Sequence, residues 1–126
     1  MDDWIVIDTS VLVELTRMGP KATVLRSHAD GKRWIVPEIV LAEFSGKLHA
    51  YGCKTVASVL ESLSRKSDVK GINVAIADRA GQVYLAHKKN GLAMNDAVIW
   101  STTEYYGAKL LTLDNDFKPF KNAIVL

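Results

Sequence analysis

The sequence predicts an α/β fold with a mostly parallel sheet and helices on both of its faces. Short apolar runs that suit buried strands alternate along the chain with longer segments of helical periodicity, which is the pattern of βαβ units. Two of these runs end beside an aspartate, Asp8 at the first and Asp114 at the fourth. Because ligands of such sheets bind beyond the carboxyl ends of the strands, we expect a functional site at that edge.

Five apolar runs are the predicted strands. They cover residues 4–8, 34–36, 69–74, 109–113 and 123–126. Gly71 interrupts the third run, and a glycine weakens the interior of a strand. Pairs of helical segments separate the first four runs, and such connections are long enough to join parallel strands.

Six helical segments are predicted from apolar periodicity. They cover residues 9–18, a short stretch up to residue 28, and residues 37–50, 54–65, 76–89 and 95–106. Thr9 or Ser10 can cap the first helix. Pro37 suits the first turn of the third. Asn95 is the predicted cap of the last helix, which Gly107 closes.

Length and composition favour a single globular domain over residues 1–126. The 48% hydrophobic content and mixed charges are not those of a disordered chain, and the net charge of +2 neither indicates nor excludes a nucleic-acid ligand. Cys53 is the only cysteine, so no intramolecular disulfide can form, which fits a reducing compartment. Asp2 and Asp3 stand where a secretory signal is basic, and no apolar stretch approaches the roughly 20 residues that span a bilayer. We predict a cytoplasmic protein without a membrane partner.

Four acidic residues spread along the chain are the candidate site residues: Asp8, Glu43, Asp96 and Asp114. Each lies beside a predicted buried strand or helix, where an ionised carboxylate costs several kcal/mol unless its charge is compensated. Four such groups brought together repel one another, and a divalent cation relieves that repulsion. The pattern therefore indicates a metal-dependent enzyme.

A site built from these carboxylates offers only oxygen ligands, which suit Mg²⁺ or Mn²⁺ rather than zinc. The three histidines, His28, His49 and His87, show no metal-ligand spacing. Carboxylate-held Mg²⁺ serves phosphate chemistry, where one ion, or two about 4 Å apart, activates water and stabilises the leaving oxygen. We predict one or two such ions.

Each acid also has a purely structural explanation. The dipole of a helix favours a carboxylate such as Asp96 in its first turn by about 0.3–1 kcal/mol. Asp8 can belong to the turn and cap at the start of the first helix, and residues 114–116 can form an Asx-rich turn. Glu43 lies at the edge of the apolar stripe of its helix and can be an ordinary exposed residue. The joint placement of all four at strand and helix ends is what favours a site.

Other acid-rich α/β families fit less well. A haloacid-dehalogenase-type phosphotransferase requires a second aspartate two residues after the first, where this chain has Ser10. A response-regulator receiver requires an acidic pair near the end of the first strand and a phospho-accepting aspartate after the third. Asp2–Asp3 come too early, and Asp78 falls within a predicted helix. The absence of a Walker loop and of GxGxxG argues against a nucleotide-cofactor enzyme.

Four segments in order resemble the motifs of the PIN-domain ribonucleases, especially the small VapC-like toxins of type II toxin–antitoxin systems. They are IVIDTS (5–10), VPEIVLAE (36–43), NDAVI (95–99) and LTLDNDF (111–117). The resemblance covers nearly the whole chain, and the ordered set is more specific than any one segment. Leu113 departs from the pattern, since members usually have Arg or another polar residue there, so local substrate contacts can differ.

The resemblance implies a three-layer α/β/α sandwich and endonucleolytic hydrolysis of RNA by an activated water. It implies that Asp8, Glu43, Asp96 and Asp114 surround Mg²⁺ or Mn²⁺, with Asp116 as a further metal ligand. Ser10, Asn95 and Thr112 match supporting positions beside the site. It also implies a homodimer and a protein antitoxin that binds near the active site.

Surfaces for substrate and partner are less sharply defined. The cations that can follow an RNA backbone, or equally be solvated helix residues, are Lys47, Lys54, Arg65, Lys66, Arg79, Lys88 and Lys89. Trp100, Tyr105 and Tyr106 can stack on bases or pack in the core. The apolar stretch 11–25 can form an antitoxin groove or pack against the neighbouring helix.

The leading hypothesis is a metal-dependent endoribonuclease that acts as the toxin of a toxin–antitoxin pair. The alternative is a catalytically inactive PIN-like module that binds RNA or a protein. A DNA-directed nuclease is a third possibility, because nothing in the sequence reads a 2′-hydroxyl. The presence of all four acids favours the first hypothesis.

Overall fold

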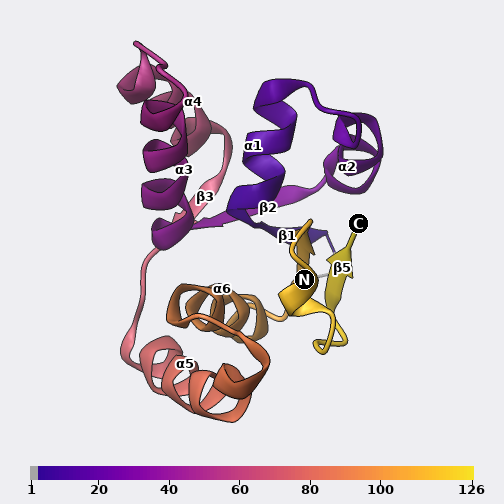
Figure 1. The fold of residues 1–126 in the computed structure, drawn as a ribbon, viewed down its shortest axis with the longest axis vertical. Coiled ribbons are helices and arrows are strands. Elements are labelled where there is room, and N and C mark those ends of the chain that lie inside the picture. Colours follow the sequence, from indigo (N-terminus) through magenta and orange to yellow (C-terminus); the bar gives the residue numbers. More distant parts are fainter. Residues whose placement is uncertain (1–2) are drawn as a thin grey trace.

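A five-stranded, all-parallel sheet lies at the centre of the computed structural model, which describes residues 3–126 (Figure 1). The strands are β1 (Trp4–Ile7), β2 (Arg33–Pro37), β3 (Asp68–Lys70), β4 (Lys109–Thr112) and β5 (Ala123–Val125). They follow the order β3-β2-β1-β4-β5. The predicted parallel sheet is confirmed.

The helices form the outer layers. They are α1 (Thr9–Arg17), α2 (Ala22–Ala29), α3 (Glu38–Ala50), α4 (Val56–Lys66), α5 (Val74–His87) and α6 (Met94–Tyr105), with short 3-10 turns η1 (Lys88–Asn90) and η2 (Asn115–Phe117). Figure 1 shows α1 to α4 on one side of the sheet and α5 and α6 on the other. This is the three-layer α/β/α arrangement that the motif resemblance implied.

The strand order creates a switch point between β1 and β4. The chain leaves β1 towards α1 on one face and reaches β4 from α6 on the opposite face. Ile7 pairs with Leu111, and the backbone N–H of Asp8 donates to the Leu111 carbonyl at 3.1 Å. Asp8 and Asp114 therefore follow neighbouring strands at the same edge of the sheet, where ligands of such folds bind.

The core is built on the central strands. Ile5, Val6 and Ile7 of β1 are fully buried, as are Leu110 and Leu111 of β4. Strands covered by helices on both faces are continuously apolar rather than alternating, which explains these runs. The edge strands β3 and β5 contain only half-buried residues.

Three predicted boundaries are wrong. Thr9 and Ser10 lie inside α1, whose cap is Asp8, because the Asp8 carboxylate accepts the Thr9 N–H at 2.8 Å. Asn95 lies inside α6, whose N-cap is Ala93, because its amide bonds to another helix instead. Pro37 is the last residue of β2 and precedes α3.

The third strand is also shorter than predicted. It ends at Lys70, and Val74 already begins α5, with Asn73 capping that helix through a bond from Ile76 N–H at 2.8 Å. The predicted closure at Gly107 is confirmed, since it follows α6 with a φ of +61° that favours glycine. Within residues 3–126, no helix is long and apolar enough to cross a membrane. The acidic start at residues 1–2 lies outside the described residues.

Candidate active site

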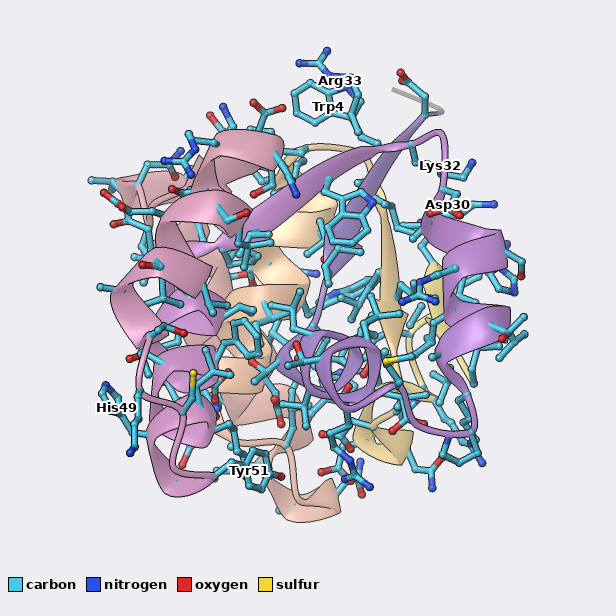
Figure 2. All side chains as sticks on the ribbon, turned by 90° about the horizontal axis from the view of Figure 1, so that it is seen from above. Trp4, Asp30, Lys32, Arg33, His49 and Tyr51 are labelled. Carbon is cyan, nitrogen blue, oxygen red and sulfur yellow. The ribbon has the colours of Figure 1, made fainter. Side chains whose placement is uncertain are left out.

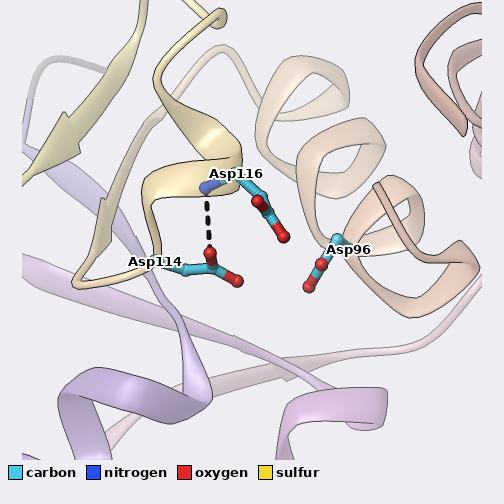
Figure 3. Close-up of side chains that lie close together, drawn as sticks. All are labelled: Asp96, Asp114 and Asp116. Atoms are coloured by element: carbon cyan, nitrogen blue, oxygen red, sulfur yellow. Dashed lines mark hydrogen bonds between the residues drawn. The ribbon is translucent and has the colours of Figure 1, made fainter. Parts of the chain in front are cut away.

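Three aspartates converge at the carboxyl edge of the sheet. Asp96, Asp114 and Asp116 each offer a carboxylate oxygen, and these oxygens all lie within 4.8 Å of one another (Figure 3). Asp96 is in the first turn of α6, Asp114 follows β4, and Asp116 is in η2. Asp96 is thus both a helix-start residue and a member of the cluster. The start of α6 and the loop after β4 therefore together supply one cluster of three carboxylates.

The DND segment folds as the Asx turn considered in the sequence. Asp114 Oδ1 accepts the backbone N–H of Asp116 at 2.9 Å, the bond drawn in Figure 3. A side chain that bonds its own backbone two residues on is typical of such turns. The turn and the acidic cluster are therefore one feature, because this bond sets Asp114 and Asp116 side by side.

Asp8 lies in the same cavity but outside that cluster. It is 5% exposed, and its two oxygens accept three hydrogen bonds from the protein. The donors are Thr9 N–H at 2.8 Å, the Ser10 hydroxyl at 2.9 Å and the Thr112 hydroxyl at 2.7 Å. Burial raises the pKa of Asp8, these donors oppose that rise, and the charge of Asp114 adds to it.

The hydroxyls of Ser10 and Thr112 fasten the start of α1 to the loop after β4. Besides bonding Asp8, Ser10 Oγ accepts the Leu113 N–H at 3.0 Å, and Thr112 Oγ1 accepts the Asp114 N–H at 2.9 Å. Leu113 takes part through its backbone, so the unusual side chain at this position leaves the bonding intact.

Glu43 reaches the cavity from α3 and is held from two sides. Its Oε1 accepts the Thr9 hydroxyl at 2.7 Å, and its Oε2 accepts the Asn95 amide. The buried residues Val40 and Phe44 fix this part of α3 against the core. Glu43 is half-buried and hydrogen-bonded rather than an ordinary exposed helix residue. No local pattern indicated the part played by Thr9, since the bond joins residues 34 positions apart.

Uncompensated negative charge is the main electrostatic property of the site. The pKa of Asp96 is raised to about 7, first by partial burial and then by the charges of Asp114, Asp8, Glu43 and Asp116. A bound cation would remove this repulsion. All the donor atoms are carboxylate oxygens, which fit a hard divalent ion such as Mg²⁺ or Mn²⁺.

All four predicted acids line one open cavity of about 490 Å³. Its other lining residues are Thr9, Ser10, Val13, Glu14, Arg17, Lys47, Tyr51, Ala93, Asn95 and Leu113. The sequence interpretation missed Arg17 and Tyr51. Tyr51 lies eight residues after Glu43, a helical spacing that gave a usable signal for the shared face.

Most of the other predicted substrate contacts lie elsewhere. Trp100 is 7% exposed and stacks on Phe120 with ring centres 4.5 Å apart, so it belongs to the core. Tyr106 packs against Trp4. Tyr105 is exposed but does not line the cavity.

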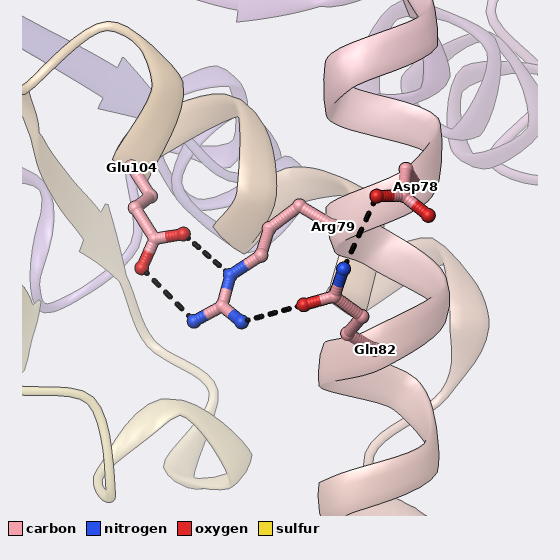
Figure 4. A network of polar contacts seen from close by, with 4 residues as sticks. All are labelled: Asp78, Arg79, Gln82 and Glu104. Atoms are coloured by element: carbon pink, nitrogen blue, oxygen red, sulfur yellow. Dashed lines mark hydrogen bonds and ion pairs between the residues drawn. The ribbon is translucent and has the colours of Figure 1, made fainter.

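Lys47 alone of the seven predicted cations lines this cavity. Arg79 is bound to Glu104 across α5 and α6, and Gln82 extends the contact to Asp78 (Figure 4). Arg79 therefore pairs with another residue of the protein, and its contact with RNA stays a prediction.

A second, more apolar groove of about 510 Å³ lies between α1, α3 and α4. Its lining residues are Leu12, Leu15, Thr16, Trp34, Phe44, Ser58, Val59, Ser62, Leu63 and Lys66. From the stretch 11–25, Val11 and Leu25 are fully buried, whereas Leu12 and Leu15 contribute to the groove. Part of this stretch therefore packs in the core and part lines a groove, and antitoxin binding there stays a prediction.

Comparison with known proteins matches residues 5–122 to the family model of the PIN domain. A chain from a toxin–antitoxin complex of Klebsiella pneumoniae superposes with a TM-score of 0.81 at 20% identity over 96% of both chains. VapC20 of Mycobacterium tuberculosis, a sarcin–ricin loop-cleaving toxin, gives 0.77 at 18% over 94% of this chain and 95% of that one. A chain of VapBC2 from Rickettsia felis, bound to promoter DNA, gives 0.75 at 20% over 98% and 97%. No curated protein matches the sequence significantly.

Proposed function

Because the chain belongs to the PIN domain family, we propose that it is an endoribonuclease that depends on Mg²⁺ or Mn²⁺ and acts as the toxin of a toxin–antitoxin pair. The observation that carries the proposal is that Asp8, Glu43, Asp96 and Asp114 line one open cavity, with a carboxylate oxygen of Asp116 within 4.8 Å of those of Asp96 and Asp114. Clustered carboxylates that raise the pKa of Asp96 to about 7 are the arrangement a divalent ion stabilises.

We assign the catalytic roles to Asp8, Glu43, Asp96 and Asp114. Asp96, Asp114 and Asp116 are the residues best placed to hold one ion or two, with Asp8 and Glu43 completing the anionic surface. A divalent ion there would supply neutralisation of the phosphate charge and activation of water.

The remaining polar side chains orient these acids. Ser10 and Thr112 hold Asp8, while Thr9 and Asn95 hold Glu43. Asp8 and Glu43 are thus held in place before substrate binds, so these two side chains need little reorganisation during the reaction. The open cavity leaves room for a strand of nucleic acid to approach them.

RNA as the substrate is supported by the sarcin–ricin loop-cleaving toxin among the structural relatives. The antitoxin is supported by the toxin–antitoxin complexes of these relatives, and we assign its docking to the apolar groove between α1, α3 and α4. We further propose a homodimeric protein, built from the single domain 1–126, that acts in the cytoplasm.

Cleavage of a pool of tRNA and structured RNA by the purified protein tests the function. We expect cutting with Mg²⁺ or Mn²⁺ that EDTA abolishes and that Asp96→Asn removes, because that change deletes a charge at nearly constant shape. Asp30→Asn, at an exposed acid outside the cavity, is the matched control and keeps activity. A folded, inhibitor-free protein that binds this RNA without cutting it would instead establish the alternative, an inactive binding module.

A further inference from the structure

The acidic cavity has one wall of opposite charge. Arg17 of α1 and Lys47 of α3 line it together with Tyr51, the C-cap of α3. The same three residues also line a small hollow between α1 and α3, so they are neighbours. We call these three residues the outer wall.

Helical spacing places Lys47 and Tyr51 in line with Glu43, each farther along α3 from the carboxylates. Glu43, Lys47 and Tyr51 follow one another at intervals of four residues along α3, so they share one face and rise by about 6 Å at each step. Tyr51 stands at the far end of this line and is 61% exposed. Figure 2 shows it at the opposite end of the molecule from Lys32 and Arg33.

Within residues 3–126, neither cation of the outer wall forms a salt bridge. Across residues 3–126 the salt bridges are Arg33–Asp68 and Arg79–Glu104.

Glu14, which also lines the cavity, does not pair with Arg17. Its carboxylate accepts the Lys21 N–H at 2.9 Å, and it lies so close to Gly19 that a Cβ at that position would clash with it. This acid is thus turned towards the loop between α1 and α2. The charges of Arg17 and Lys47 remain available to a ligand.

We propose that the outer wall binds a single-stranded stretch of RNA next to the bond that is cut. Arg17 and Lys47 contact backbone phosphates, and the exposed ring of Tyr51 stacks on a base. A stacking platform requires an unpaired base, because paired bases do not offer their faces to a side chain. The inference rests on the proposed function and names single-stranded RNA as the form of substrate that the site takes.

Binding measured without cleavage tests this inference. The probe is a fluorescein-labelled single-stranded RNA of mixed sequence and about 12 nucleotides. Its anisotropy is followed with the Asp96→Asn protein in Mg²⁺ over a range of salt concentrations. Circular dichroism shows that each further variant is folded. Because this readout needs no turnover, it stays informative even if the protein proves not to be a nuclease.

Arg17→Ala or Lys47→Ala is expected to weaken binding about tenfold at low salt, as for loss of a hydrogen bond to a charged group. Each should also reduce the slope of log affinity against log salt by about 0.7, the value for one phosphate contact on a single strand. Lys32→Ala removes the same charge at the opposite end of the molecule and should change neither quantity. Equal losses in Lys47→Ala and Lys32→Ala would overturn the phosphate contacts.

Tyr51→Ala is expected to weaken binding about fivefold or more while leaving the salt slope unchanged, because stacking is not electrostatic. Tyr51→Phe keeps the ring and should keep the affinity. Tyr105→Ala, at an exposed tyrosine outside the cavity, is the matched control. The stacking contact is refuted if the two alanine variants bind alike, or if Tyr51→Ala weakens binding of a fully paired duplex of the same sequence equally.

Discussion

The side-chain amide of Asn95 donates a hydrogen bond to Oε2 of Glu43, and this bond ties α6 to α3 across the cavity. These two helices lie on opposite faces of the sheet (Figure 1). The other oxygen of Glu43 accepts the Thr9 hydroxyl and so brings in α1. One half-buried carboxylate thus connects three helices beside the acidic cluster, and its partners matter to the fold as well as to the site.

Loss of the Asn95 amide should destabilise the protein. We expect Asn95→Ala to lower the free energy of unfolding by about 1–2 kcal/mol, because Glu43 loses a donor in a partly buried position. Asn95→Asp should lower it further than Asn95→Ala at pH 7, since it replaces the donor with a second carboxylate against Glu43. Urea unfolding measures both. Asn90→Ala, at an exposed amide in η1, is the control, and an equal loss there would contradict the prediction.

The stability of the metal-free protein should fall as the pH rises from about 4 to about 7. The pKa of Asp96 is about 7 in the folded protein against 3.8 for the free side chain, so in this range the folded state binds more protons than the unfolded state. The raised pKa of Asp8 acts in the same direction. Thermal unfolding in EDTA across this range measures the effect, and a rise in stability would contradict it.

Asp96→Asn should flatten that pH dependence and raise the stability of the metal-free protein at pH 8. The amide has no charge to repel Asp114, Asp8, Glu43 and Asp116. Mg²⁺ or Mn²⁺ should raise the melting temperature of the unmodified protein more at pH 8 than at pH 5, because protons compete with the ion for the carboxylates. This difference should be much smaller in the variant. An equal metal-induced shift in both proteins would show that the ion binds elsewhere.

Thr112→Val should harm both the fold and the metal site. The buried hydroxyl donates to Asp8 at 2.7 Å and accepts the Asp114 N–H at 2.9 Å. Its loss should lower the free energy of unfolding by about 2 kcal/mol and raise the pKa of Asp8 further. We expect weaker Mn²⁺ binding by calorimetry, with Thr112→Ser close to the unmodified protein.

Thr102→Val removes a comparable buried hydroxyl, bonded to Val98 O at 2.8 Å within α6, and is the matched control. This variant should lower the free energy of unfolding by about 1 kcal/mol and leave Mn²⁺ binding unchanged. Weakened Mn²⁺ binding in this control would assign the loss at Thr112 to general destabilisation rather than to the site.

The Arg79–Glu104 pair should contribute little to stability and nothing to cleavage. Its two side chains are 46% and 43% exposed, and exposed ion pairs contribute about 0–1 kcal/mol. Arg79→Ala, Glu104→Ala and the double variant measure the coupling between the two residues by urea unfolding. A loss of RNA cleavage in Arg79→Ala would contradict this prediction and show that Arg79 contacts the RNA substrate.

Local patterns were sufficient to predict the sheet and the four acids that line the cavity. The runs at β1 and β4 are continuously apolar because both faces are covered, and an aspartate that follows such a strand must lie at the carboxyl edge. Asp8 and Asp114 were therefore found from short-range signals alone. Their catalytic roles remain a proposal.

The errors fall where a distant residue takes over a local role. Asn95 has the chemistry of a helix cap, but Glu43, 52 residues away, accepts its amide instead. Trp100, by contrast, packs in the core against Phe120, which was one of its two predicted placements. Arg17 carried no motif at all, and only the packing of α1 against α3 places it in the cavity.

The central position of β1 has a consequence for the growing chain. The bond between Thr112 and Asp8 spans 104 residues, and Asp114 and Asp116 are made later still. At about 5–20 residues per second, β1 waits several seconds for β4, the later of its two partner strands, during translation. A nascent chain on the ribosome therefore lacks an assembled acidic cluster until nearly all of these residues have been made. For a protein proposed to cut RNA, this order of synthesis means that no cleavage is expected before residues 112–116 have been made and folded.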